Sequence, residues 1–284
     1  MSHVMSVRFD GDILSEQHYI SLRTASKVFG HLQVAVDRAH LQKLGRLHKH
    51  AKLGAEQYQS HVIWLGDSLA NCRTFQILAD NDDKQLIDVV KMNFVDAFEG
   101  AVKKGIAAEV EDIRDESRLV LAKVESGVVR PTRYNEFRVL NEERFSSGFI
   151  RRAIAKELVK IGSVVSSEGA GASSITLDFL GEDSEAVTLN RQIAELLRNY
   201  VGQRSLGDPV VYAGEYRGGD VFTKTGKFKN ALNGKTMIVR FDKKEDAMFL
   251  NGFSGQVVSI VCCPVLEYGT HDVECGDVFY LKKI

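Results

Sequence analysis

The periodicity of apolar residues changes at Pro209, and this change constrains the fold more than any other feature of the sequence. Upstream, apolar residues recur every three or four positions, as in amphipathic helices. Downstream, they alternate in short stretches separated by Gly and Asn, as in strands joined by turns. The stretches are VVYAGEY (210–216), TMIVRF (236–241), GQVVSIVCC (255–263) and VFYLKKI (278–284). Short strands at even spacing are typical of a small β-barrel.

Upstream of Pro209, two helices have the clearest periodicity. One covers about 21–44, with Leu22, Phe29 and Val36 on its apolar face, and the other runs from the acidic residues 80–83 to about 104. Between them, HVIWLG (61–66) and CRTFQILAD (72–80) predict a hairpin, and a third helix ends at Gly127. We therefore expect an α+β protein, a mixed body followed by a C-terminal small β-barrel of SH3-like or OB-like type.

Two stretches predict boundaries. Pro131 disfavours a helix, so VVRPTRYNEFRVL (128–140) indicates a break followed by a strand over 134–140, with a helix starting near Ser146 or Ser147. The stretch GQRSLGDP (202–209) predicts an exposed connection before the barrel. The expected organisation is an α+β region over 1–130, a β-α-β-α segment over 131–208 packed on it, and the barrel over 209–284.

Composition points to a cytoplasmic protein without membrane segments. The four cysteines include no Cys-x-x-Cys pair, which favours reduced thiols in the cytoplasm. No apolar run approaches the roughly 18 residues that a membrane helix needs. The 37 basic and 38 acidic residues give a net charge of −1, so charge can indicate a partner only through its distribution.

Gly234-Lys235-Thr236 resembles the end of a phosphate-binding loop, but Lys229 stands where the first glycine of that loop is required. A strand-like segment follows it instead of a helix, so no helix dipole would assist a phosphate. Asn233-Gly234 is better interpreted as a type I′ hairpin turn.

Other candidate motifs are also incomplete. EGAGASS (168–174) has Ser174 in place of the third glycine of a dinucleotide fingerprint. Asp178 and Glu182 form the nearest approach to paired carboxylates, and THDVECGD (270–277) lacks the spacing of a metal loop. We expect no cofactor and no metal, and because no catalytic motif is complete we favour a protein without a catalytic site.

Two windows of the sequence contain cations and no acids. Between Asp37 and Glu56 the chain carries Arg38, Lys43, Arg46, Lys49 and Lys52. Between Asp220 and Asp242 it carries Lys224, Lys227, Lys229, Lys235 and Arg240, interleaved with Phe222 and Phe228. Lysines beside aromatic residues on a barrel suit phosphate contacts and base stacking.

The sequence therefore predicts a non-catalytic protein that binds nucleic acid or another polyanion, alone, as an oligomer or within a larger assembly. Lys224, Lys227 and Lys229 would contact phosphates and Phe228 would stack on a base. One alternative is a protein-interaction or regulatory module that meets an acidic protein partner. Another is an enzyme or small-ligand binder that uses Asp178 or the 168–174 loop, with its site between body and barrel.

Overall fold

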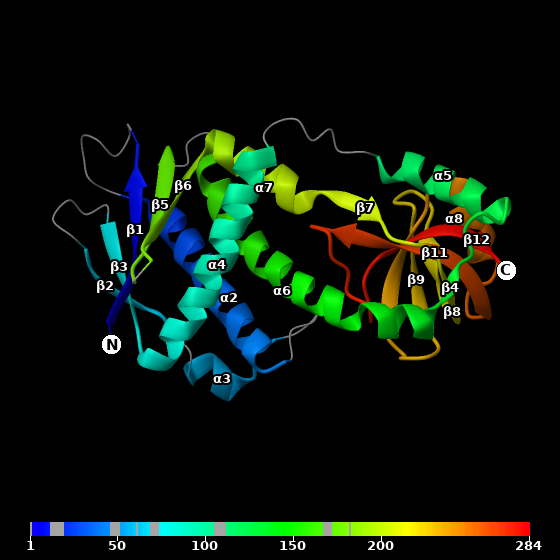
Figure 1. Cartoon of the computed structure of the whole chain (residues 1–284), viewed down its shortest axis with the longest axis horizontal. Coiled ribbons are helices and arrows are strands. Elements are labelled where there is room, and N and C mark those ends of the chain that lie inside the picture. The colour runs from blue at the N-terminus through cyan, green and yellow to red at the C-terminus, as the bar shows by residue number, and fades with distance from the viewer. Residues whose placement is uncertain are drawn as a thin grey trace. The chain divides into compact units, whose positions relative to one another are not determined.

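Figure 1 shows a computed structural model of the chain. It describes residues 2–11, 20–45, 52–60, 62–68, 74–104, 112–166, 172–181 and 183–284. The chain forms two compact units: an N-terminal unit of Met1–Ala108 and Ile150–Gly202, and a C-terminal unit of Glu109–Phe149 and Gln203–Ile284. Each unit combines helices with a sheet, so the fold is α+β. None of the described helices is long and apolar enough to cross a membrane.

The N-terminal unit contains an antiparallel five-stranded sheet in the order β2-β3-β1-β5-β6. Its strands are β1 (Ser2–Asp10), β2 (Trp64–Ser68), β3 (Thr74–Ala79), β5 (Ser174–Phe179) and β6 (Glu185–Asn190). The central strand β1 has high β propensity, and its Met5, Val7 and Phe9 side chains are fully buried. The hairpin expected from 61–80 corresponds to β2 and β3, which pair antiparallel.

The helices of the N-terminal unit are α2 (Leu22–Lys43), α3 (Ala55–Ser60), α4 (Asn81–Lys104) and α7 (Arg191–Gly202). The helix expected over 21–44 is confirmed as α2, where the Ser21 hydroxyl accepts a hydrogen bond from the Thr24 amide at 3.1 Å. The helix expected after residue 80 is confirmed as α4, which packs against α2 and α7. Phe94 of α4 meets Phe179 of β5 edge to face.

Helix α6 (Tyr134–Ser166) corrects the expected boundary. The strand predicted over 134–140 was wrong, because the helix begins directly after the two-residue strand β4 (Thr132–Arg133). Tyr134 and Phe137 lie three positions apart and are both buried, as the helical period requires. The chain passes from one unit to the other within this helix, between Phe149 and Ile150, so the units are not the consecutive segments expected from the sequence.

The C-terminal unit contains a seven-stranded sheet in the order β4-β8-β9-β10-β12-β11-β7, with an additional pairing between β8 and β11. Besides β4, its strands are β7 (Arg204–Leu206), β8 (Val210–Asp220), β9 (Thr225–Asn230), β10 (Thr236–Arg240), β11 (Val257–Glu267) and β12 (Val278–Lys283). The pairs β10–β12 and β4–β8 are parallel, and the others are antiparallel. The strands expected at 210–216, 236–241, 255–263 and 278–284 are confirmed as β8, β10, β11 and β12.

Two apolar clusters stabilise this unit. The larger one contains Tyr212, Phe228, Val239 and Cys262 from four different strands. The second lies between the strands and helix α5 (Ile113–Glu125) and contains Val124, Val261 and Cys263. The adjacent residues Cys262 and Cys263 therefore face opposite sides of β11, as the alternation of a strand requires.

One expectation for this region was wrong, and another holds in part. The helix α8 (Lys244–Asn251) lies downstream of Pro209, where no helix was expected, because its two turns are too short to give a clear period. The expectation of an exposed connection over 202–209 holds in part: the boundary between the units lies between Gly202 and Gln203, and Arg204, Ser205 and Asp208 are exposed, but β7 also pairs with β11 through Leu206 opposite Val265. Leu206 is buried, and Arg204 forms an ion pair with Glu267 at 2.9 Å.

Candidate nucleic-acid interface

The second basic window spans the loop 221–224, strand β9, the loop 231–235 and strand β10. In β9, Lys227 is exposed and Lys229 half-buried on one face, while Phe228 between them points inward. Lys227 lies opposite Ile238 of β10, and Lys229 lies opposite Thr236. Neither lysine forms an ion pair within the part of the chain that the structure describes. Their ammonium groups are therefore available on the outer face of β9.

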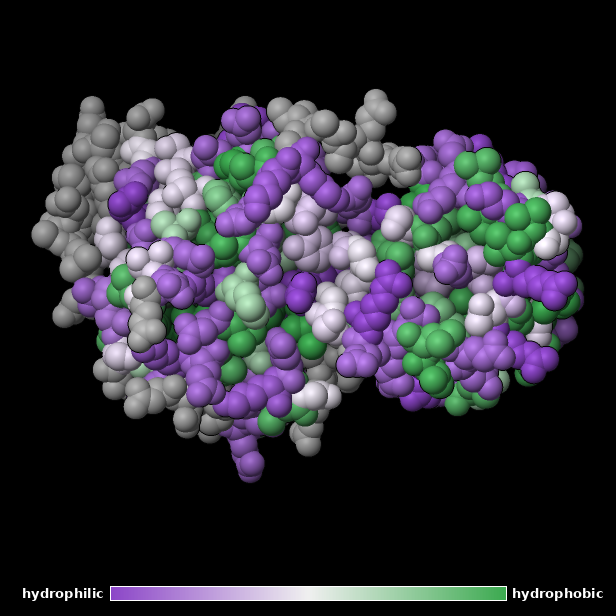
Figure 2. Space-filling model, viewed as in Figure 1, coloured by the Kyte–Doolittle hydropathy of each residue, from purple (hydrophilic) through white to green (hydrophobic). Residues whose placement is uncertain are grey.

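Strand β8 adds one acid and one further cation beside these lysines. Glu215 lies opposite Lys229 in the register, and Arg217 approaches Glu215 at 3.4 Å. Because Arg217 already compensates Glu215, this carboxylate does not cancel the charge of the two lysines. Figure 2 shows hydrophilic and hydrophobic residues intermixed on the visible face around β8–β12.

The stacking contact predicted for Phe228 does not agree with its position. The ring is fully buried in the larger apolar cluster, where it lies opposite Tyr216 of β8 and Met237 of β10. Successive side chains of a strand point to opposite faces, so the residue between two outward-facing lysines points toward the interior. This alternation explains the error. Phe228 is a core residue.

The exposed aromatic residue of the window is Phe222, whose side chain is 86% exposed. It lies in the loop 221–224, where Asp220 Oδ1 accepts hydrogen bonds from the amides of Phe222 at 2.7 Å and Thr223 at 3.3 Å. These bonds favour the charged form and lower the pKa of Asp220. The ammonium group of Lys244 lies 5.6 Å from the Phe222 ring centroid. An aromatic face and a cation are therefore adjacent in this loop.

Lys224 ends the same loop in an uncommon conformation. Its φ of 52° lies in the left-handed region, which costs a non-glycine residue about 1–3 kcal/mol. Its ammonium group donates to the backbone oxygen of Asp242 at 2.8 Å, and its carbonyl accepts from the Phe241 amide at 3.0 Å. These bonds hold Lys224 in place and leave its positive charge without a carboxylate partner among them.

The two remaining cations of the window form ion pairs. Lys235 pairs with Glu274, which raises the pKa of Lys235 mainly through their hydrogen bond. Arg240 donates to Asp277 Oδ2 from Nε at 3.0 Å and from Nη2 at 2.6 Å. Along the outer face of β9, we therefore expect smaller contributions to backbone-phosphate binding from Lys235 and Arg240 than from Lys227 and Lys229.

Among its described residues, the first basic window does not form a comparable face. Arg38 points to Glu157, a fully buried carboxylate that also contacts His31 at 2.9 Å and Lys160 at 2.9 Å. Lys43 donates to the side chain of Gln85 at 3.3 Å, and Lys52 is exposed. Arg46 and Lys49 lie outside the described residues. Arg38 therefore has a structural role in the N-terminal unit.

The rejected motifs can be placed in the fold. Asn233-Gly234 belongs to a hairpin between β9 and β10, as expected, but not to a type I′ turn, since five residues connect the strands and Asn233 has no positive φ. In the 270–277 loop, Asp272 Oδ1 accepts from the amides of Glu274 and Cys275, and His271 is buried between Phe137 and Phe145. Within the described ranges, no group of three or more His, Cys, Asp or Glu side chains could hold a metal ion.

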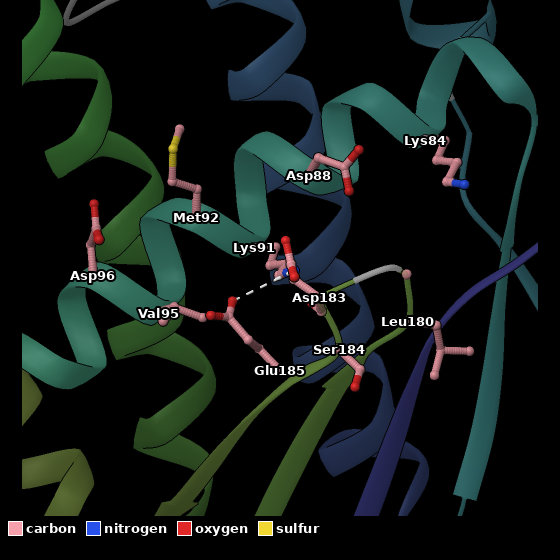
Figure 3. Close-up of a pocket in the computed structure, with 11 residues that line it drawn as sticks. Lys84, Asp88, Lys91, Met92, Val95, Asp96, Leu180, Asp183, Ser184 and Glu185 are labelled. Carbon is pink, nitrogen blue, oxygen red and sulfur yellow. Dashed lines mark hydrogen bonds and ion pairs between the residues drawn. The ribbon is translucent and has the colours of Figure 1, made fainter.

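The N-terminal unit contains a surface groove of about 800 Å³ between α4 and the β5–β6 hairpin. Figure 3 shows Lys91 reaching from α4 toward Asp183 and Glu185 of the hairpin. Lys91 donates to the Asp183 backbone oxygen and lies 3.6 Å from Glu185. Cations and carboxylates alternate along this groove. Asp178 lies on β5 but does not line the groove, and Glu182 and 168–171 lie outside the described residues.

No protein-family model, curated protein or solved structure matches this chain. Functional inference therefore depends on the geometry and charge of its own residues.

Proposed function

We propose that the C-terminal unit binds single-stranded nucleic acid along the outer face of β9 and β10 and the loop 221–224. The observation that carries the proposal is the arrangement of Lys227 and Lys229 on one exposed face, beside a loop that presents the Phe222 ring and Lys224. Lysines neutralise phosphates, and an exposed aromatic ring stacks on bases of any sequence. No catalytic step is part of this proposal.

We also infer that five strands of this unit close into a small OB-like barrel. The pairings β8–β9, β9–β10, β10–β12, β12–β11 and β11–β8 return to their starting strand, which supports closure. When these five strands are numbered along the chain, their order around the ring is first, second, third, fifth, fourth, which is a Greek-key arrangement. Strands β4 and β7 extend the sheet beyond this ring.

The OB-like arrangement supports the same interface. OB-folds bind oligonucleotides with their second and third strands and with the loops between strands one and two and between strands four and five. Here the second and third strands are β9 and β10, and the first of these loops is 221–224. A fold alone does not determine function, so the exposed side chains of β9 and of the loop 221–224 carry the proposal.

Fluorescence anisotropy with a labelled oligothymidine of about 12 nucleotides tests the proposal, because OB-folds cover about 4–16 nucleotides. An unlabelled heparin fragment serves as a competitor with charge but no bases. We expect Phe222→Ala to weaken binding of the oligonucleotide and leave that of heparin unchanged. Equal losses for both ligands would contradict base stacking, and a failure to bind the oligonucleotide at low salt would contradict the proposal as a whole.

A further inference from the structure

A cavity of about 400 Å³ in the C-terminal unit lies beside the loop 221–224. Four cations line it, and each comes from a different element: Arg114 of α5, Arg204 of β7, Lys224 of the loop, and Arg240 of β10. Phe241 and Phe279, both nearly fully buried, give it an apolar wall. The cavity therefore combines a cationic lining with apolar rings.

Two of these arginines, Arg204 and Arg240, are held in position by carboxylates that do not line the cavity. Arg204 directs Nε and Nη2 to a single oxygen of Glu267, at 3.0 and 2.9 Å. Arg240 directs the same two nitrogens to a single oxygen of Asp277. The carboxylate fixes the orientation of each arginine. Because a guanidinium has five N–H donors, further donors of each arginine can bind another acceptor. Preorganised arginines of this kind suit a planar or tetrahedral oxyanion.

Among the lining residues cations outnumber carboxylates, and the partners of Arg204 and Arg240, Glu267 and Asp277, do not line the cavity. Asp112 is the one lining carboxylate among the described residues, and its Oδ1 caps α5 by accepting from the Arg114 amide at 3.1 Å. Burial lowers the pKa of Arg204, and the neighbouring charge of Arg240 lowers it further, whereas Asp277 acts in the opposite direction. Arg204 and Arg240 each have a carboxylate partner but still repel each other in this partly desolvated cavity, and a bound anion would relieve this repulsion.

A phosphomonoester matches this cavity better than a phosphodiester. It carries about 1.5 to 2 negative charges at neutral pH and three strong acceptor oxygens, whereas each backbone phosphate carries one charge. Arginine binds phosphate through two parallel N–H···O bonds. A volume of about 400 Å³ lies within the range of small-ligand sites and exceeds what a lone phosphate fills.

We propose that this cavity binds a phosphomonoester dianion, carried by the phosphorylated end of a nucleic-acid strand or by a free mononucleotide. The strand-end form rests on the proposed function, because Thr223 and Lys224 belong both to the cavity and to the loop of the interface. A strand that follows β9 and the loop 221–224 would place its end against Arg204 and Arg240.

The test compares oligothymidines of equal length that end in a 5′-phosphate, a 3′-phosphate or only hydroxyl groups, measured by anisotropy against the wild-type protein. We expect one phosphorylated form to bind at least about tenfold more tightly, a difference of about 1.4 kcal/mol. Thymidine monophosphate is measured in parallel by calorimetry to detect the free nucleotide. Thymidine serves as its control without phosphate.

Two variants locate the effect. Arg204→Gln and, separately, Arg114→Gln should abolish the preference for the phosphorylated end and leave the affinity for the hydroxyl-ended strand unchanged. Arg114 lies 4.0 Å from Asp112 and is half exposed, so its replacement tests the cavity even if Arg204→Gln destabilises β7. Lys227→Ala/Lys229→Ala should weaken all three strands equally and keep the preference.

The outcomes separate the two proposals. Equal binding of all three strands, with no binding of thymidine monophosphate, would contradict phosphomonoester binding in the cavity and leave the proposed function intact. Binding of thymidine monophosphate but of no strand would overturn the proposed function and support the cavity as a nucleotide site. A preference for the phosphorylated end that survives in both arginine variants would place the phosphate elsewhere and overturn the inference.

Discussion

Lys227 and Phe228 are neighbours in β9 but lie on opposite sides of the sheet, the first exposed and the second fully buried. The pleat of the strand separates a charge that can meet a ligand from a ring that stabilises the interior. The first prediction follows from this separation.

Phe228→Ala should reduce the free energy of unfolding by about 3–5 kcal/mol, because it leaves a cavity in the larger apolar cluster. Phe222→Ala should change it by less than about 0.5 kcal/mol, since that ring is exposed, but should weaken oligonucleotide binding by about 1–3 kcal/mol. Urea denaturation and anisotropy check both variants. A stable Phe228→Ala variant would contradict the inward orientation of Phe228 in β9, and destabilisation by Phe222→Ala would contradict the exposure of that ring.

Two tyrosines of the same cluster form a matched pair. The Tyr212 hydroxyl is buried and has no hydrogen-bond partner among the described atoms, whereas Tyr134 donates to the Val273 oxygen at 3.0 Å and accepts from Asn233 at 2.8 Å. Tyr212→Phe should therefore leave the stability unchanged or raise it, and Tyr134→Phe should lower it by about 1–3 kcal/mol. Urea denaturation of the two variants checks the difference, and equal losses would contradict it.

Stability should decline in alkaline solution. Burial raises the pKa of Cys263 to about 12 and that of Tyr134 also to about 12. Because both groups keep their protons longer in the folded state, their contribution is complete below the usual thiol pKa of about 8.5 and is lost as pH rises toward 12. The free energy of unfolding, measured from pH 8 to 11, should fall, and the fall should be shallower for Cys263→Ala. A constant value across this range would contradict the prediction.

Arg38 should matter for stability and not for binding. Among the described residues, removing it leaves the buried Glu157 with His31 and Lys160, and the loss of a hydrogen bond to a buried charge costs about 1–3 kcal/mol. Arg38→Ala should therefore lower the midpoint of urea unfolding, while Lys52→Ala, at an exposed position, should not. If the Arg38→Ala variant had normal stability but lost affinity for the oligonucleotide, the prediction would be wrong and the first basic window would belong to the interface.

The sequence predicted the elements that have a long, regular period. Residues 21–44 and the chain after residue 80 form helices because their apolar faces recur over many turns, and β8, β10, β11 and β12 have alternating or β-branched residues. The two turns of α8 are too short for such a pattern. The first turns of α6 differ from the prediction because Pro131 disfavours a helix only in its own vicinity, and the helix starts three residues later.

The candidate site was predicted in part. The exposed lysines of β9 could be found because a cation-rich stretch without acids is visible in the sequence. The roles of Phe222 and Phe228 could not be distinguished, because β9 was not among the predicted strands. Without that strand, the sequence does not indicate which side chains point inward and which point outward. Arg114 and Arg204 are 90 positions apart and join one cavity only through the packing of α5 and β7 in the C-terminal unit.

The central claim is that Lys227 and Lys229 contact the phosphates of a single strand, and the salt dependence of binding tests it most directly. For single strands, the logarithm of the binding constant falls by about 0.7 per logarithmic unit of salt for each phosphate neutralised. The control variant Lys27→Ala/Lys123→Ala removes two exposed lysines, one from α2 and one from α5, and so changes the net charge equally. We predict that Lys227→Ala/Lys229→Ala lowers the magnitude of the slope by about 1.4 and that the control variant keeps the wild-type slope. Equal slopes for the three proteins, or no binding at low salt, would contradict the interface and favour an acidic protein as the partner of this surface.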